Sequence, residues 1–184
     1  MKVFKIQENG INMVWKVADT GCVRLLHFSA LPFDESTIVD EYEEQGFKLL
    51  ELEAAGYDRP DERHGTKYIV TAPGYRMQYA EHKDYRNETG RKLEITTQDQ
   101  ESGLQAVNHF QFFDGIAVVR CWCEVSNMGK ETQTIQYVST FNLNGVEKEG
   151  LLSRDEKIRI GVVHNSWQRE LLLQEYTLPE VGLQ

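Results

Sequence analysis

The sequence predicts an all-β protein folded as an antiparallel β-sandwich. Apolar and polar residues alternate with a period of two in several stretches, which is the pattern of strands with one buried face. The pair Asp114-Gly115 separates two such stretches and is typical of a tight hairpin turn. Turn residues recur at intervals of about 8 to 12 residues, a spacing that favours an antiparallel sandwich over alternating strands and helices.

The clearest strand is predicted over residues 116–126. Side chains alternate between the two faces of a strand, so this stretch has one purely apolar face and one mixed face. We expect the apolar face to point inward and the mixed face to be partly covered. The inward set is Ala117, Val119, Cys121, Cys123 and Val125, and the other set is Ile116, Val118, Arg120, Trp122 and Glu124.

Two further strands are predicted on either side of it. Residues 104–113 would pair with it through a type I′ turn at Asp114-Gly115. Residues 132–143 alternate again and follow a short turn at residues 127–130. The three stretches are therefore expected to form consecutive antiparallel strands.

The remaining elements are predicted from the same alternation. One helical candidate, residues 36–45, starts with the N-cap residue Ser36, but its acidic residues extend to the end where the helix dipole disfavours them. A helix and an acidic loop both remain open there. The other predicted strands are residues 12–17, 22–28, 47–52, 67–71, 91–98 and 158–163.

Size and charge limit the kinds of partner. The 184 residues, of 21.3 kDa, predict a single domain over residues 1–184. With 20 basic and 29 acidic residues the net charge is −9, which is unfavourable for nucleic acid or an anionic membrane, so neither is expected. A neutral ligand such as a sugar is compatible with this charge. We find no apolar stretch near the ~20 residues of a membrane helix and no signal peptide, and expect a cytoplasmic location.

No cofactor or metal site is predicted. Cys121 and Cys123 share one strand face and are expected to be buried free thiols, since a metal or redox pair would need C-x-x-C spacing or a second ligand cluster. His109 is expected to be a satisfied strand-face residue, and Trp122 to lie under another layer. The sequence carries no serine-hydrolase, zinc-peptidase or phosphate-binding motif.

Two stretches, residues 64–127 and 162–183, carry more particular motifs. The motifs are His64-Gly65 with Lys67, Pro73-Gly74, Arg86-Asn87 with Gly90-Arg91, Thr97 through Gly103-Leu104, His109 to Arg120, Asn127 with Gly129, and His164-Asn165-Ser166-Trp167. In this order along the chain, they resemble the N-terminal β-sandwich of family 36 glycoside hydrolases, the α-galactosidases. The resemblance spans about residues 56–183, and the first fifty residues fit it loosely.

The resemblance implies part of a retaining α-galactosidase. In that family a super-sandwich, similar to galactose mutarotase, precedes a (β/α)₈ barrel that carries an aspartate nucleophile and an aspartate acid/base. A barrel needs about 200 residues, so no catalytic residue is assigned here, and we expect a truncated piece of the sandwich domain. The implied partners are an α-galactoside, the catalytic barrel of the same enzyme and further copies of the chain in a homo-oligomer.

The chain departs from the family pattern at two positions. Tyr68 stands where relatives often have a second histidine, and Arg63 stands where a histidine often precedes His64. An imidazole-specific role at these two positions is therefore not expected.

Two polar segments supply candidate substrate contacts. Asp61 and His64 lie in a polar stretch that follows an apolar one, where loops on a rigid scaffold often hold ligand contacts; the alternative is a solvated turn. In the second segment, Trp167 could stack on a sugar while His164 and Asn165 bind its hydroxyls. The alternative for Trp167 is packing in a core or against another domain.

Three function classes remain open at this point. The first is the noncatalytic sandwich of an α-galactosidase, which aids assembly and shapes the substrate rim. The second is a free-standing carbohydrate-binding module, which would bind galactosides without a barrel. The third is an oligomerisation module, which would self-associate without binding sugar.

Overall fold

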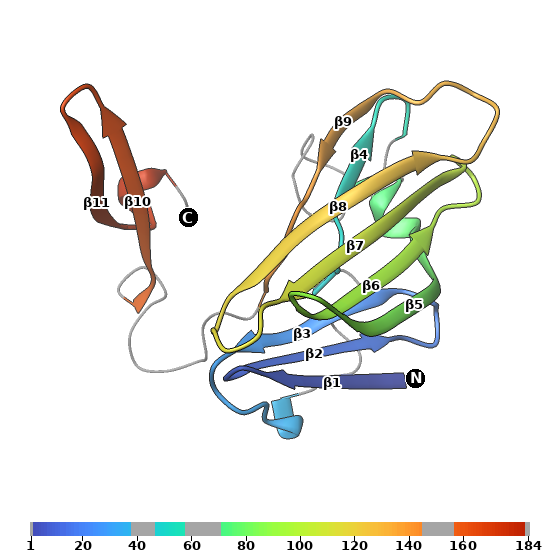
Figure 1. The fold of residues 1–184 in the computed structure, drawn as a ribbon. Helices are drawn as coiled ribbons and strands as arrows, with labels where there is room; N and C mark the ends of the chain where they lie inside the picture. Colours follow the sequence, from blue (N-terminus) through green and yellow to red (C-terminus); the bar gives the residue numbers. More distant parts are fainter. Residues whose placement is uncertain (1, 38–46, 58–70, 145–156, 183–184) are drawn as a thin grey trace. The chain divides into compact units, whose positions relative to one another are not determined.

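The computed structural model describes residues 2–37, 47–57, 71–144 and 157–182, whose regular structure is almost entirely antiparallel β-strand (Figure 1). The predicted all-β class is confirmed. The chain divides into two compact units, Met1–Asn144 and Gly145–Gln184, each described here by itself.

A four-stranded antiparallel sheet is the centre of the first unit. Its order is β5-β6-β7-β8, so each strand pairs with its neighbour in sequence. The strand predicted over residues 91–98 is confirmed as β6. The bounds are β5 Gln78–Asn87, β6 Gly90–Gln98, β7 Leu104–Phe112 and β8 Val119–Asn127.

The predicted hairpin at Asp114-Gly115 is present between β7 and β8, but its turn is longer than expected. Gly115 has φ +77°, as the Asp-Gly pair suggests, yet the connection covers residues 113–118. Backbone hydrogen bonds from Ile116 N to Phe113 O and from Val118 N to Ile116 O hold this wider turn. The strand predicted from residue 116 therefore begins at Val119.

A second sheet has the order β1-β2-β3, with bounds Lys2–Glu8, Ile11–Val17 and Val23–Ser29. The strands predicted over residues 12–17 and 22–28 are confirmed as β2 and β3, whereas β1 was not predicted. Asn9 and Gly10 join β1 to β2 with φ +50° and +82°, the positive values that an Asn-Gly hairpin turn needs. Asn9 Nδ2 also donates to Phe113 O at 2.8 Å, which ties this turn to the β7–β8 turn.

The prediction for residues 132–143 is wrong in extent and in partner. Only Ile135–Val138 forms a strand, β9, and it pairs with β4 (Leu52–Ala54) instead of β8. The side chain of Asn127 closes the turn after β8, accepting from Gly129 N and donating to Glu131 O. Beyond this turn the chain pairs with β4.

Two other predictions also need correction or fall outside the described residues. Of residues 47–52 only Leu52 belongs to a strand, although Lys48 forms an isolated bridge to Arg24 on β3. Of the helical candidate, the structure describes Ser36 and Thr37, which end a 3₁₀ turn (Glu35–Thr37). The predicted strand 67–71 lies outside the described residues except at Thr71.

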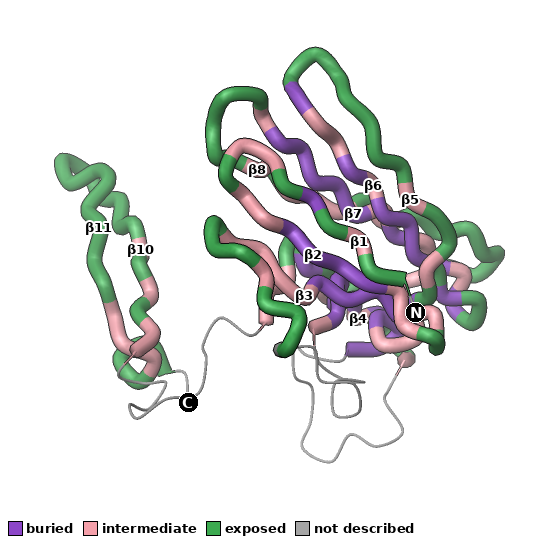
Figure 2. Tube along the Cα trace, turned by 90° about the horizontal axis from the view of Figure 1, so that it is seen from below, coloured by how far each residue is buried: buried purple, intermediate pink, exposed green. Residues whose placement is uncertain are grey.

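The core lies on the inner face of the four-stranded sheet and has two parts. The larger part joins residues of β6 and β7 to residues of β1, β2 and β3, and the smaller part joins β7 to the segment around β4. Buried residues accordingly concentrate on β2, β6 and β7 (Figure 2). The larger cluster is Ile6, Met13, Trp15, Val23, Leu25, Leu49, Leu93, Ile95, Phe110 and Phe112, and the smaller is Leu50, Leu52, Ala54, Met77, Leu104 and Ala106.

An ion pair fixes the turn between β6 and β7. Arg76, at the end of a 3₁₀ turn (Gly74–Arg76), donates through Nε and Nη2 to the two carboxylate oxygens of Asp99 at 3.0 and 2.8 Å. Asp99 also accepts from Ser102 N and Oγ, and its side chain is only 4% exposed. Burial alone would raise the pKa of Asp99, but the hydrogen bonds from Arg76 and Ser102 outweigh it and hold this pKa below its usual value.

We predict that Asp99→Asn lowers the free energy of unfolding by about 2 to 4 kcal/mol at pH 7, because it leaves Arg76 with only the more distant and exposed carboxylate of Glu101 as an anionic partner. The carboxylate's stabilisation is present above about pH 4 and is lost as pH falls through the lowered pKa of the folded state. Urea unfolding should therefore show a smaller difference in the free energy of unfolding between the parent protein and Asp99→Asn below about pH 3 than at pH 7. Asp84→Asn, which breaks a more exposed pair with Arg91, should cost only about 0.2 to 1 kcal/mol. Equal losses for the two variants would contradict the prediction.

Candidate functional site

Three of the predicted contact residues lie at one end of a β-hairpin. Its strands are β10 (Arg159–Ser166) and β11 (Arg169–Thr177), of which β10 confirms the strand predicted over residues 158–163 and β11 was not predicted. Ser166 pairs with Arg169, so Trp167 and Gln168 form a two-residue turn. Gln168 takes φ +66° there, a conformation unusual for a residue with a side chain.

His164 and Asn165 make hydrogen bonds within this hairpin. His164 Nε2 lies 2.9 Å from the hydroxyl of Tyr176, which in turn donates to Gln174 Oε1. Because the hydroxyl proton goes to Gln174, the imidazole nitrogen is the donor in the first bond. Asn165 Oδ1 accepts from Leu171 N at 2.9 Å, beside the β-bulge between His164 and Ser166. Both side chains thus hold the shape of the hairpin end.

Trp167 differs from these two residues because its side chain makes no hydrogen bond to another described residue. It is 92% exposed at the tip of the hairpin, so it is not a core residue of the described chain. Packing against another domain remains an open alternative. An exposed indole can supply an apolar face for stacking and one N–H donor.

The other two predicted contact residues, Asp61 and His64, lie outside the described residues. The structure therefore brings together His164, Asn165 and Trp167 on one hairpin. The proposed contribution of Asp61 and His64 stays a prediction.

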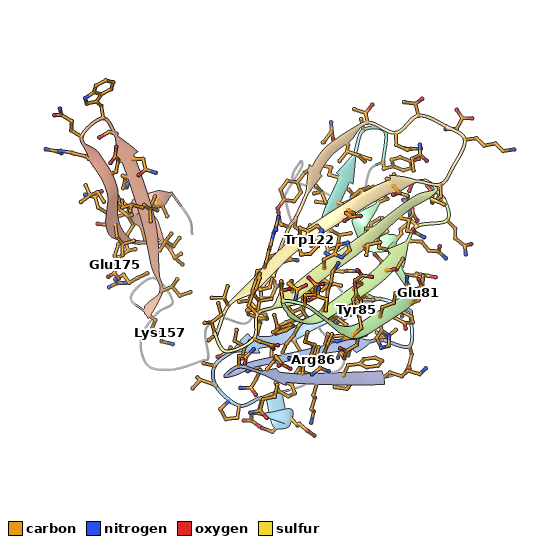
Figure 3. All side chains as sticks on the ribbon, in the orientation of Figure 1. Glu81, Tyr85, Arg86, Trp122, Lys157 and Glu175 are labelled. Carbon is orange, nitrogen blue, oxygen red and sulfur yellow. The ribbon has the colours of Figure 1, made fainter. Side chains whose placement is uncertain are left out.

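Sequence reasoning missed a cluster of aromatic and charged side chains on the outer face of the four-stranded sheet, which includes Tyr85 and Trp122 (Figure 3). His109 on β7 stacks on Trp122 of β8, with ring centroids 4.5 Å apart and planes 6° apart. Trp122 Nε1 donates to Glu124 at 3.1 Å, and Lys92 Nζ lies 5.0 Å from the Trp122 ring centre. The cluster comprises Tyr85, Lys92, Glu94, His109, Trp122 and Glu124.

The charges within this cluster are partly compensated. Glu94 lies 2.8 Å from Lys92 and accepts from Tyr85 at 2.9 Å, which together lower its pKa despite the opposing effect of burial. The nitrogens of His109 lie 3.4 and 3.3 Å from Glu94 and Glu124, but burial lowers the pKa of His109 and favours the neutral ring. These contacts link β5, β6, β7 and β8 across the outer face of the sheet. The pairs Lys92/Glu94 and Trp122/Glu124, two residues apart on a strand, are the cluster's sequence signal.

The cysteines on the opposite face of β8 are free thiols, as the sequence predicted. Cys121 and Cys123 are half-buried, and burial raises their pKa values to about 11 and about 12. Both therefore stay protonated near neutral pH and are poor nucleophiles. Among the described residues, no group of three or more histidine, cysteine or acidic side chains could hold a metal ion. No helix in the described part of the chain is long and apolar enough to cross a membrane.

Comparison with known proteins finds similar solved structures but no matching family model and no matching curated protein. Two crystal structures of the family 36 α-galactosidase AgaA from Geobacillus stearothermophilus, one of them a variant in complex with 1-deoxygalactonojirimycin, are 16% identical to this chain with a TM-score of 0.48. A variant of the same enzyme with raffinose is 17% identical with a TM-score of 0.47. Each comparison covers 70% of this chain, which spans 22% of the α-galactosidase chain.

We predict that Trp167→Ala changes the free energy of unfolding by less than about 0.5 kcal/mol, because the indole is exposed. Trp15→Ala is the matched comparison: Trp15 is 1% exposed in the larger core cluster, so its loss should cost about 3 to 5 kcal/mol. Thermal and urea unfolding of both variants measure the difference. A loss above about 2 kcal/mol for Trp167→Ala would mean that the indole packs against another part of the protein.

Proposed function

We propose that this chain is the noncatalytic N-terminal β-sandwich of a family 36 α-galactosidase and contributes side chains to the rim of a galactoside site. The ordered series of motifs over about residues 56–183 is the observation that carries this proposal. The antiparallel all-β fold agrees with the fold that these motifs imply. The exposed indole at the hairpin tip supports a surface role for the last motif.

The chemistry of the rim follows from the side chains. Trp167 offers a flat apolar face on which the C–H face of a galactose ring can stack. Asp61 accepts hydrogen bonds from sugar hydroxyls, and His64 can donate or accept one. His164 and Asn165 position the turn that holds Trp167, since their own hydrogen bonds are made within the hairpin.

Bond cleavage is assigned to a barrel and not to these residues. Retaining hydrolysis needs two carboxyl groups about 5 Å apart across the glycosidic bond, one as nucleophile and one as acid/base. The sandwich adds binding energy from parts of the substrate away from the reacting bond. Such remote contacts raise kcat/KM only where they hold the transition state.

We predict that the purified chain releases no nitrophenol from p-nitrophenyl α-galactoside. Turnover that survives repurification and disappears when one of the chain's own carboxylates is replaced would overturn the noncatalytic assignment. Titration of the same sample with galactose and raffinose, followed by NMR, separates the remaining classes. Saturable binding by the chain alone would favour a free-standing binding module, and self-association without sugar binding would favour an oligomerisation module.

We predict that Asp61→Ala and Trp167→Ala each lower kcat/KM for raffinose in the complete enzyme, the chain joined to its catalytic barrel. A hydrogen bond lost to a charged group is worth about 1 to 3 kcal/mol, or roughly 5- to 150-fold. Glu62→Ala and Gln168→Ala are the matched controls, because each removes a polar neighbour in the same segment. Unchanged kcat/KM in both test variants, with melting temperatures preserved, would reject the rim role.

A further inference from the structure

The outer edge of β8 is long and regular, and no strand in the described part of the chain pairs with it. β8 is the last strand in the order β5-β6-β7-β8, and its register with β7 runs without a bulge from Val119 to Asn127 (Figure 1). Such an edge presents a row of backbone donors and acceptors that another strand can use. Natural proteins often protect these edges with proline, charged side chains or a bulge. β8 has no proline and no bulge, and its charged residues are Arg120 and Glu124.

The opposite edge of the same sheet is protected in this way. A register shift interrupts β5 between Tyr79 and Glu81. Exposed charged side chains follow along the strand, among them Glu81 and Arg86 (Figure 3). The two edges therefore differ in their readiness to accept a further strand.

The outer face of β8 is complementary to itself in antiparallel pairing. If two copies pair with Trp122 opposite Trp122, residue 120 of each copy lies opposite residue 124 of the other. Arg120 then faces Glu124 twice, and opposite charges at facing positions stabilise a strand pair. Both side chains are accessible. Arg120 is exposed and lies over the Trp122 ring, with Cζ 5.3 Å from the ring centre, and it has no ion pair with a described carboxylate. Glu124 accepts from Trp122 Nε1, and its side chain is 64% exposed.

The inner face of β8 is complementary in the same register. Val119 would lie opposite Val125, and Cys121 opposite Cys123, so apolar side chains meet apolar side chains. All four are only half-buried in the single chain, although they pack against the two core clusters. A second strand along this edge would cover them.

We propose that two copies of this chain associate through β8, antiparallel about a two-fold axis at Trp122, and join their four-stranded sheets into one continuous sheet. The partner is a second copy because the charge pattern and the apolar pattern both match their own reverse about the same residue. This isologous contact closes on itself and yields a dimer. The β8 dimer does not depend on the proposed galactoside rim. Evidence against the dimer would therefore leave the proposed rim role unaffected.

Charge reversal tests the contact and its register by sedimentation velocity across the micromolar range. Arg120→Glu places two carboxylates at each pair of facing positions, and Glu124→Arg places two guanidinium groups there. Each variant alone should therefore dissociate at least about tenfold more readily than the parent. An equimolar mixture of the two variants should dimerise again, since both facing pairs are then opposite in charge. The double variant should also restore the dimer.

Two variants on the protected edge are the matched controls. Lys83→Glu and Glu81→Arg on β5 change the net charge by the same amounts as the two test variants and should leave the dimer unchanged. Far-ultraviolet circular dichroism confirms that every variant keeps its strands.

Each other outcome overturns the proposal. A parent protein that stays monomeric at high micromolar concentration has no such contact. A dimer that resists both single reversals uses another surface. A dimer that is weakened by each reversal but not restored in the mixture has a different register.

Discussion

The structure of the first unit depends on covering one apolar face of the four-stranded sheet. Phe110 and Phe112, at one end of β7, need the β1–β3 sheet above them, and Leu104 and Ala106, at the other end, need the segment around β4. Without this cover the sheet would expose apolar surface to water, which costs roughly 25 cal/mol of folding free energy for each Å². Because two separate segments cover this apolar face, the connections between strands must keep their positions. The turn held by Arg76 and Asp99 is one such connection.

The same constraint explains how the two faces of β8 differ. Its inner side chains complete the edge of the core, where cover is thinnest, so Cys121 and Cys123 are half-buried thiols with raised pKa values. Its outer side chains face away from the core and are held by one another, as in the stack of Trp122 on His109. β8 is regular, carries its charges in a symmetric pattern and is only half covered. These features suit it to pairing with a matching strand.

Local patterns predicted β2, β3, β6, β7, β8 and β10 but missed β1, β5 and β11, and the pairing between distant segments was predicted poorly. The alternation in β6 and β8 is visible in sequence because one face of each packs against the core, whereas β2 and β3 have buried residues on both faces. The choice of β4 as the partner of β9 depends on how the core is shared, which no local pattern encodes. Asn9-Gly10 was a readable hairpin signal that sequence reasoning overlooked. The site was predictable only as residue types, since the bonds of His164 to Tyr176 and of Asn165 to Leu171 follow from the hairpin register.

The hairpin end has both stacking area and polar groups left to offer. His164 and Asn165 commit hydrogen-bonding groups within the hairpin, whereas Trp167, Gln168 and Arg169 remain exposed. An indole provides stacking area, but selection of one sugar over another needs several donors and acceptors fixed around its hydroxyls. No hydrogen bond to a described residue fixes the side chains of Gln168 and Arg169. The proposed rim role therefore requires further polar groups, which in that proposal the rest of the enzyme supplies.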